Sequence, residues 1–302
     1  MSEMKLSQNP IFVVGYPRSG TTLLQALLAT QGDLATFPET HFFSTAYTTK
    51  ASSGEESLSA GEVEKVLNEI GQRSGLAFSP SEIAAINALG SDDHLPIKGV
   101  FEFLVAKLLP AEAGPGCRWL EKTPDHAFFM ARIAKLYPEA KFIGIIRHPL
   151  FAIHSRTKHF PPDAPDQLRF LARQWVRHVD ALDDFKGSFP SKIFVLKYED
   201  LVQDPAGVIE KVTRFLGIDF DIHSIQDFSK RAQNIVQPFE NWKDGVKSNT
   251  IENKDKSVEK IFGKKEIFKI QSIVHNKMRQ LGYEINYPTE QGFYNIFLKY
   301  FI

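Results

Sequence analysis

Short apolar runs alternate with helix-compatible segments along this chain. The apolar runs cover residues 11–14, 34–37, 118–120, 142–146 and 193–196. Residues 167–185 carry apolar side chains at helical spacing, and Trp175 belongs to that apolar stripe, so we expect it in the core. Strands that alternate with helices predict an α/β fold with a parallel sheet, helices on both faces and a ligand crevice beyond the carboxyl ends of the strands.

Residues 45–116 interrupt this alternation. They are polar and alanine-rich, with helical patterns at Gly61 to Gly71 and Val100 to Leu109. We expect a single domain over residues 1–302 that carries 45–116 as a helical insertion. As a cap above the crevice, the insertion would determine which molecule binds there, and a packing subdomain is the alternative.

The segment IFVVGYPRSGTTLL, residues 11–24, runs from a candidate strand through a glycine-bounded loop into a candidate helix. Backbone N–H groups of such a loop point toward the helix start, which favours anion binding. The nucleoside-triphosphate loop needs lysine at position 21, where this chain has Thr21. Arg18 supplies a cation inside the loop instead, and its planar guanidinium suits a terminal oxyanion group. A glycine-rich turn without a ligand is the alternative.

This loop resembles the 5′-phosphosulfate loop of sulfotransferases that use 3′-phosphoadenosine 5′-phosphosulfate (PAPS), in which PRSGTT or PKSGTT is typical. The resemblance implies the P-loop-type α/β fold of that family and PAPS as co-substrate. It also implies that the loop binds the donor through the following residues: Arg18, Ser19, Gly20, Thr21 and Thr22.

A second strand-to-helix junction follows residues 142–146, where Arg147 ends the strand and Pro149 suits a first helical turn. Ser155 lies eight positions after Arg147, about two turns along at ~3.6 residues per turn, so both side chains can reach one ligand. Sulfotransferases show this Arg-x7-Ser arrangement at the 3′-phosphate of PAPS, which implies that role here. A surface arginine and an ordinary helix hydroxyl are the alternatives.

Two further segments, FPET at 37–40 and WLEKTPD at 119–125, are similar to the tyrosylprotein-type branch of the family. In that branch a glutamate at about this distance from the loop arginine is the general base, which implies the role for Glu39. A lysine in a K-x-P segment faces the transferred sulfonate there, which implies that role for Lys122. The alternative for Glu39 is a solvent-facing loop carboxylate, and the alternative for Lys122 is a solvated ion pair with Glu121.

A late YEDL segment is similar to the same superfamily and implies a donor contact for Tyr198. The resemblance covers roughly residues 10–45 and 117–285.

Two departures from the tyrosylprotein branch bear on the acceptor and on the bridging oxygen. His41 stands where that branch has an arginine for an acidic acceptor, so a tyrosine-peptide substrate is not implied, and a hydrogen-bonded loop histidine is the alternative role. The serine expected shortly before Trp242 is absent, which leaves Ser248 as a candidate for that helper role.

Sulfuryl transfer moves a sulfonate group in line between two oxygens, so positioning and fixed cations carry the catalysis and no metal is required. We therefore expect transfer from PAPS to a hydroxyl of a small molecule, carbohydrate or lipid. Arg18 and Lys122 would hold the sulfonate and Glu39 would take the acceptor proton. The alternatives are a nucleotide-dependent kinase of the same fold and a non-catalytic binder of PAPS or adenosine bisphosphate.

Composition bounds the class of protein. The 302 residues carry 36 basic and 36 acidic side chains, so no bulk charge favours a nucleic-acid partner. The one cysteine, Cys117, excludes an internal disulfide, and the nine histidines show no metal-ligand spacing. The start of the sequence lacks a secretory core and no apolar run of ~18 residues occurs, so we expect a cytoplasmic protein without a transmembrane segment. Residues 293–302 hold five aromatics that dock on the body, touch a membrane surface or form a homodimer contact; we favour docking.

Overall fold

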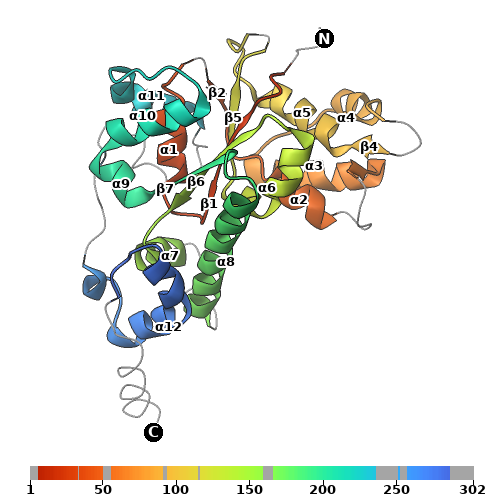
Figure 1. The fold of residues 1–302 in the computed structure, drawn as a ribbon. Helices are drawn as coiled ribbons and strands as arrows, with labels where there is room; N and C mark the ends of the chain where they lie inside the picture. Colours follow the sequence, from red (N-terminus) through yellow and green to blue (C-terminus); the bar gives the residue numbers. More distant parts are fainter. Residues whose placement is uncertain are drawn as a thin grey trace.

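The computed structural model describes residues 6–32, 34–49, 56–90, 94–114, 116–158, 166–235, 251 and 257–285. A five-stranded sheet lies at its centre, in the order β2-β5-β1-β6-β7, and each neighbouring pair is parallel (Figure 1). The strands are β1 (Ile11–Gly15), β2 (Ala35–Thr36), β5 (Trp119–Lys122), β6 (Lys141–Ile146) and β7 (Ile193–Lys197). The predicted parallel α/β fold is confirmed, and each predicted strand belongs to this sheet.

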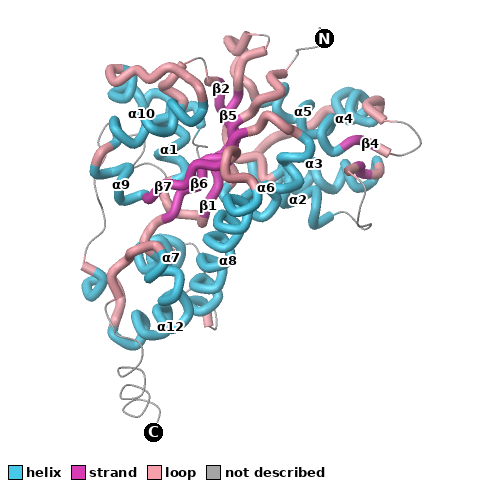
Figure 2. Tube along the Cα trace, in the orientation of Figure 1, coloured by secondary structure: helices cyan, strands magenta, loops and turns pink. Residues whose placement is uncertain are grey.

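Helices cover both faces of the sheet (Figure 2). Along β1, Phe12 and Val14 join one buried cluster whereas Ile11 and Val13 join the other, because successive side chains of a strand point to opposite faces. The second cluster is completed by α1 (Thr21–Leu28), α9 (Tyr198–Gln203), α10 (Pro205–Leu216) and α11 (Phe228–Ile235). The first includes α2 (Phe42–Thr49), α6 (Met130–Leu136), α7 (Pro149–Thr157), α8 (Gln167–Ser188) and α12 (Lys264–Gln280).

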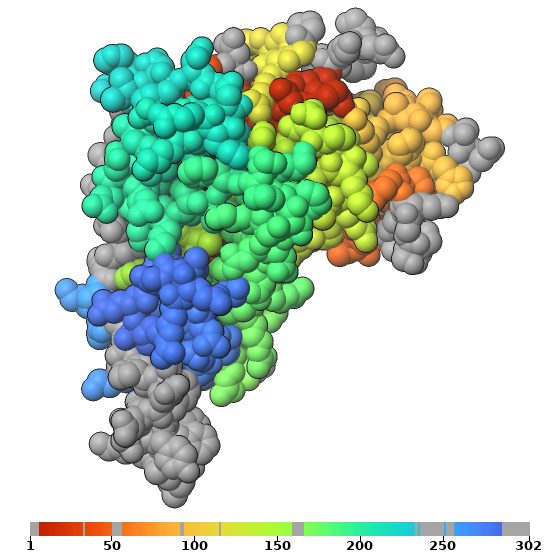
Figure 3. Space-filling model, viewed as in Figure 1, coloured from red at the N-terminus to blue at the C-terminus, as the bar shows by residue number. Residues whose placement is uncertain are grey.

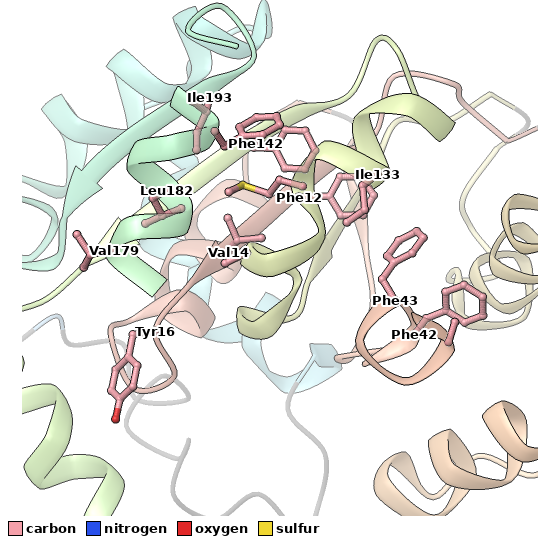
Figure 4. Close-up of a cluster of buried hydrophobic side chains, with 14 of the residues drawn as sticks. Phe12, Val14, Tyr16, Phe42, Phe43, Ile133, Phe142, Val179, Leu182 and Ile193 are labelled. Atoms are coloured by element: carbon pink, nitrogen blue, oxygen red, sulfur yellow. The ribbon is translucent and has the colours of Figure 1, made fainter. Parts of the chain in front are cut away.

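The larger cluster is built around the ring of Phe12. Its centroid lies 5.5 Å from that of Phe142 and 5.7 Å from that of Trp119, on the two neighbouring strands. Figure 4 shows Phe42 and Phe43 of α2 on one side of this cluster and Val179 and Leu182 of α8 on the other. Trp175 is fully buried in the same cluster, so its predicted packing role is confirmed.

The chain between β2 and β5 forms helices and a small ribbon. Besides α2 it contains α3 (Ala60–Ser74), α4 (Pro80–Asn87), α5 (Ile97–Leu108) and the antiparallel pair β3 (Ser57–Leu58) and β4 (Leu95–Pro96). The two predicted helices correspond to α3 and α5. Ser59 and Ser79 begin α3 and α4 with reciprocal capping boxes, which explains their sharp starts. That this segment acts as a cap stays a prediction.

The C-terminal helix α12 packs along α8 (Figures 1 and 3). Lys277 Nζ lies 2.7 Å from Asp180 Oδ1 and 2.9 Å from Asp183 Oδ2, and the two carboxylates raise the lysine pKa although burial lowers it. Beyond α12, Tyr283 donates to Glu199 at 2.9 Å. Residues 293–302 lie outside the described residues. Among the described helices, none is long and apolar enough to cross a membrane.

Gly144 has no side chain, and this allows α8 to pack closely against the sheet. A Cβ at Gly144 would lie 2.9 Å from Leu182 Cδ2 and 3.3 Å from Val195 Cγ2. We expect Gly144→Ala to lower the free energy of unfolding by about 1–3 kcal/mol through overpacking. Gly187→Ala is the control, because no atom lies within 4 Å of a Cβ there and alanine favours the helix. Urea denaturation measures both, and equal stabilities of the two variants would contradict the close approach.

Candidate active site

The loop between β1 and α1 has a backbone that only particular residues tolerate. A Cβ at Gly15 would lie 2.3 Å from the carbonyl oxygen of Ile145, so glycine lets β1 and β6 approach there. Arg18 and Gly20 follow with φ of 74° and 92°, in the left-handed region. Gly20 begins α1 without a side-chain cap. The loop therefore turns sharply into a helix start whose N–H groups can meet an anion.

Ser19 fits a donor group at this loop. Its side chain is fully buried, and its hydroxyl has no hydrogen-bond partner within the part of the chain that the structure describes. A buried hydroxyl without a partner costs free energy, which a bound phosphate oxygen would recover. Ser19, the N–H groups at the start of α1 and the Arg18 guanidinium would thus hold the 5′-phosphate side of PAPS.

The residues that follow β6 and β7 contact this loop. Arg18 Nε donates to Ser155 Oγ at 3.0 Å, and Arg147 Nη1 donates to the Arg18 carbonyl oxygen at 3.1 Å. The Arg147 guanidinium lies 4.3 Å from the ring centre of Tyr198, and that ring also packs against Gly20. The structure therefore brings together the predicted residues of the β1, β6 and β7 junctions, with Ser155 joined directly to Arg18.

Glu39 and Lys122 form an ion pair. The Lys122 side chain is only 1% exposed, so the alternative of a solvated pair with Glu121 is wrong. The Glu39 side chain is 17% exposed, and its Oε2 lies 3.3 Å from His41 Nε2. Burial lowers the pKa of His41 despite the raising effect of Glu39. His41 is therefore neutral near pH 7 and does not replace the charge of an arginine.

Glu121 and its partners were not among the predicted site residues. Glu121 is fully buried and is hydrogen-bonded to Thr40, Thr123 and His126. Adjacent residues of a strand point to opposite faces, so Glu121 and Lys122 cannot share one environment in a strand covered on both sides. That alternation, applied to WLEK, is the signal that could have indicated a buried carboxylate.

The predicted site residues lie at the carboxyl edge of the sheet, following β1, β2, β6 and β7 or ending β5. Ligands of open parallel sheets bind at this edge. Within the described ranges, no group of three or more histidine, cysteine, aspartate or glutamate side chains is arranged to hold a metal ion. Ser248 and Trp242 lie outside the described residues.

The profile of the sulfotransferase family matches residues 10–222. The chain belongs to the sulfotransferase family. A putative protein-tyrosine sulfotransferase of Caenorhabditis briggsae is 26% identical over 70% of this chain and 66% of its own length. The omega-hydroxy-beta-dihydromenaquinone-9 sulfotransferase Stf3 of Mycobacterium tuberculosis is 27% identical over 34% of this chain and 29% of its own length. The chain thus spans less than two thirds of the length of these curated relatives.

Solved sulfotransferases share the fold. The sulfotransferase domain from the curacin biosynthetic pathway is 21% identical, with a TM-score of 0.58 over 93% of this chain and 99% of that domain. A mouse sulfotransferase in complex with PAP is 16% identical, with a TM-score of 0.51 over 91% of this chain and 86% of its own. The α/β fold is therefore that of this sulfotransferase family.

Gly20 provides a test of a donor site at the loop of this family member. A Cβ there would lie 2.4 Å from Tyr198 Cδ2, so we expect Gly20→Ala to push the Tyr198 ring and Arg147 away and to weaken binding of 3′,5′-adenosine bisphosphate at least about tenfold, roughly 1.4 kcal/mol. Gly32→Ala is the matched control, because its φ of 55° is also left-handed but no atom lies within 4 Å of its Cβ. Calorimetric titration compares the two variants, and equal affinities would contradict a donor site at this loop.

Proposed function

We propose that the chain transfers the sulfuryl group of PAPS to an acceptor hydroxyl by in-line displacement. The convergence of Arg18, Ser155, Arg147 and Tyr198 at one loop, beside the ion pair of Lys122, carries this proposal. Membership of the sulfotransferase family supports it. So does the mouse relative that was solved with PAP.

PAPS supplies an activated sulfuryl group on a 5′-phosphate and a 3′-phosphate that distinguishes it from ATP. Arg147 and Ser155 hold the 3′-phosphate in this proposal, and the Tyr198 ring lines the same side of the loop. Arg18 carries its permanent charge between the two groups, since its backbone carbonyl contacts Arg147 and its guanidinium contacts Ser155. Fixed cations of this kind stabilise the charge that spreads over transferring oxygens.

Glu39 acts as the general base that takes the proton of the acceptor hydroxyl. A positioned base contributes typically ~10²–10⁴-fold to a rate. Lys122 lies beside this carboxylate, almost fully buried, where a cation interacts more strongly than in water. The lysine thus holds a positive charge beside Glu39 and next to the oxygens of the sulfonate.

The acceptor is a hydroxyl of a small molecule, a carbohydrate or a lipid in this proposal. Neutral His41 offers no cation for an acidic peptide, which supports a less charged acceptor. Relatives are named for acceptors as different as protein tyrosine and a menaquinone. The helices within residues 45–116 would cap the acceptor side. A homodimer and a cytoplasmic location stay predictions.

Arg147 distinguishes a PAPS site from a general nucleotide site. We expect Arg147→Ala to weaken binding of 3′,5′-adenosine bisphosphate by about 1.5–3 kcal/mol, the typical contribution of a hydrogen bond to a charged group, with little change for 5′-AMP. Calorimetric titration measures both ligands, and Arg169→Ala on the exposed start of α8 is the control. Equal losses for the two nucleotides, or tighter binding of ATP with magnesium by the unsubstituted protein, would argue for the kinase alternative.

Glu39 distinguishes an enzyme from a non-catalytic binder. We expect Glu39→Gln to lower turnover about 10²-fold or more, because the amide cannot accept the proton, while affinity for PAPS changes little. Release of adenosine bisphosphate from PAPS, measured with a panel of phenol, sugar and primary-alcohol acceptors, tests this. Glu102→Gln, which alters a lysine-paired glutamate of α5, is the control. Turnover that stays within a few fold would remove the base role.

A further inference from the structure

A fully buried carboxylate lies next to the catalytic pair but faces away from it. Glu121 is the third residue of β5, with no exposed surface. Its Oε1 accepts hydrogen bonds from Thr40 Oγ1 at 2.9 Å and from Thr123 Oγ1 at 2.6 Å, and its Oε2 lies 3.0 Å from His126 Nδ1. A buried charge is tolerated only when its acceptor positions are satisfied, as they are here.

The hydrogen bonds of His126 fix its tautomer. The N–H of Phe43 donates to His126 Nε2 at 3.2 Å, so that nitrogen is an acceptor and the ring hydrogen is on Nδ1. His126 Nδ1 therefore donates its hydrogen to Glu121. Burial raises the pKa of the Glu121 carboxyl, but His126 and the hydroxyls of Thr123 and Thr40 together lower it by more. The net shift of the Glu121 pKa is therefore downward. Glu121 is an ionised acceptor at neutral pH.

The same network holds the backbone that follows Glu39. The N–H of His41 donates to Thr123 Oγ1 at 3.2 Å, that of Phe42 to Thr40 Oγ1 at 3.3 Å and that of Phe43 to His126 Nε2. These successive N–H groups lie at the start of α2, where a helix leaves its own donors unpaired and where negative charge is favourable. Glu121 thus organises the segment that carries the proposed base.

Helix α1 holds the chain that precedes Glu39. Gln25 Nε2 donates to Thr36 Oγ1 at 2.7 Å and to the carbonyl oxygen of Phe37 at 2.9 Å, and Gln25 is fully buried. The chain just before Glu39 is therefore fixed to α1, and the chain just after it is fixed to β5 and its following turn. Of these two attachments, only the one through Glu121 comes from the strand that also carries Lys122.

We propose that Glu121, through Thr40, Thr123 and His126, is a positioning residue that holds Glu39 against Lys122. This inference rests on the proposed function for the role of Glu39. One carboxylate serves both partners of the pair, since it is adjacent to Lys122 in β5 and its hydrogen-bonded partners fix the residues after Glu39. A misplacement of about 1 Å can cost a reaction about 10²-fold, which is the effect the network prevents.

Glu121→Gln is the informative variant because it keeps the size of the side chain. Whichever way the amide turns, its NH2 group faces either the Nδ1 hydrogen of His126 or the two threonine hydroxyls, which already accept backbone N–H groups. We expect amide hydrogen exchange over residues 41–43 to become at least about tenfold faster. With PAPS and 4-nitrophenol as the probe, release of adenosine bisphosphate should fall about 10–100-fold in kcat, with the KM for PAPS within about threefold.

Threonine 123 supplies a matched pair of variants. Thr123→Val removes the hydroxyl at similar volume and should reproduce both effects, whereas Thr123→Ser keeps the hydroxyl and should restore exchange and kcat. Exchange across β1 and β6 is followed at the same time. A general rise in exchange across these strands, together with lost nucleotide affinity, would overturn positioning in favour of a purely structural role.

The outcomes separate this inference from the proposed function. If the unsubstituted protein releases no adenosine bisphosphate from PAPS, the proposed function fails, and exchange at 41–43 alone then decides whether Glu121 holds that segment. If Glu39→Gln leaves kcat unchanged while Glu121→Gln lowers it, positioning through Glu39 is overturned. Unchanged exchange at 41–43 in Glu121→Gln also overturns the proposal. Local exchange and kcat that change together support it.

Discussion

The position of β1 between β5 and β6 is the constraint on which the site depends. Val13 pairs with Lys122 on one side, and Gly15 pairs with Ile145 on the other. Because this register is set by apolar side chains on both faces, the loop after Gly15 emerges beside the ends of both neighbouring strands. Arg18, Lys122 and Arg147 therefore come from distant parts of the sequence yet meet at one edge.

Several polar groups at this edge are buried, among them Ser19, Glu121 and Lys122, so each of these needs a partner within the protein or a ligand. Lys122 is paired with Glu39, and Glu121 accepts hydrogen bonds from the N–H and hydroxyl of Thr40, the hydroxyl of Thr123 and His126. Removing one member of such a set leaves the other unpaired, which is why these groups couple stability to function. Ser19 is different, since its buried hydroxyl has no hydrogen-bond partner among the described residues, and a bound donor phosphate would supply one.

The fold followed from the sequence because β1 and β6 are almost entirely apolar and the long helices keep a regular spacing. The strands at 11–14 and 142–146 and the helix from Gln167 were predicted to within a few residues. The helix α4 and the ribbon of β3 and β4 were not predicted. In the ribbon, each strand has only two residues and pairs across a long connection. Periodicity carries no information about such short, non-local pairs.

The sequence predicted which candidate residues the fold gathers at this edge, but not the contacts between them. Motifs indicated the loop, the arginine after β6 and Glu39 as candidates, but they did not predict that Lys122 pairs with Glu39, and the alternative for Lys122 was an ion pair with its sequence neighbour Glu121. In the folded strand these two adjacent side chains point to opposite faces, so Lys122 meets Glu39, 83 positions away, and Glu121 turns toward α2. The alternation that builds the core thus also directs one charge to the proposed base and its neighbour to the backbone that supports that base.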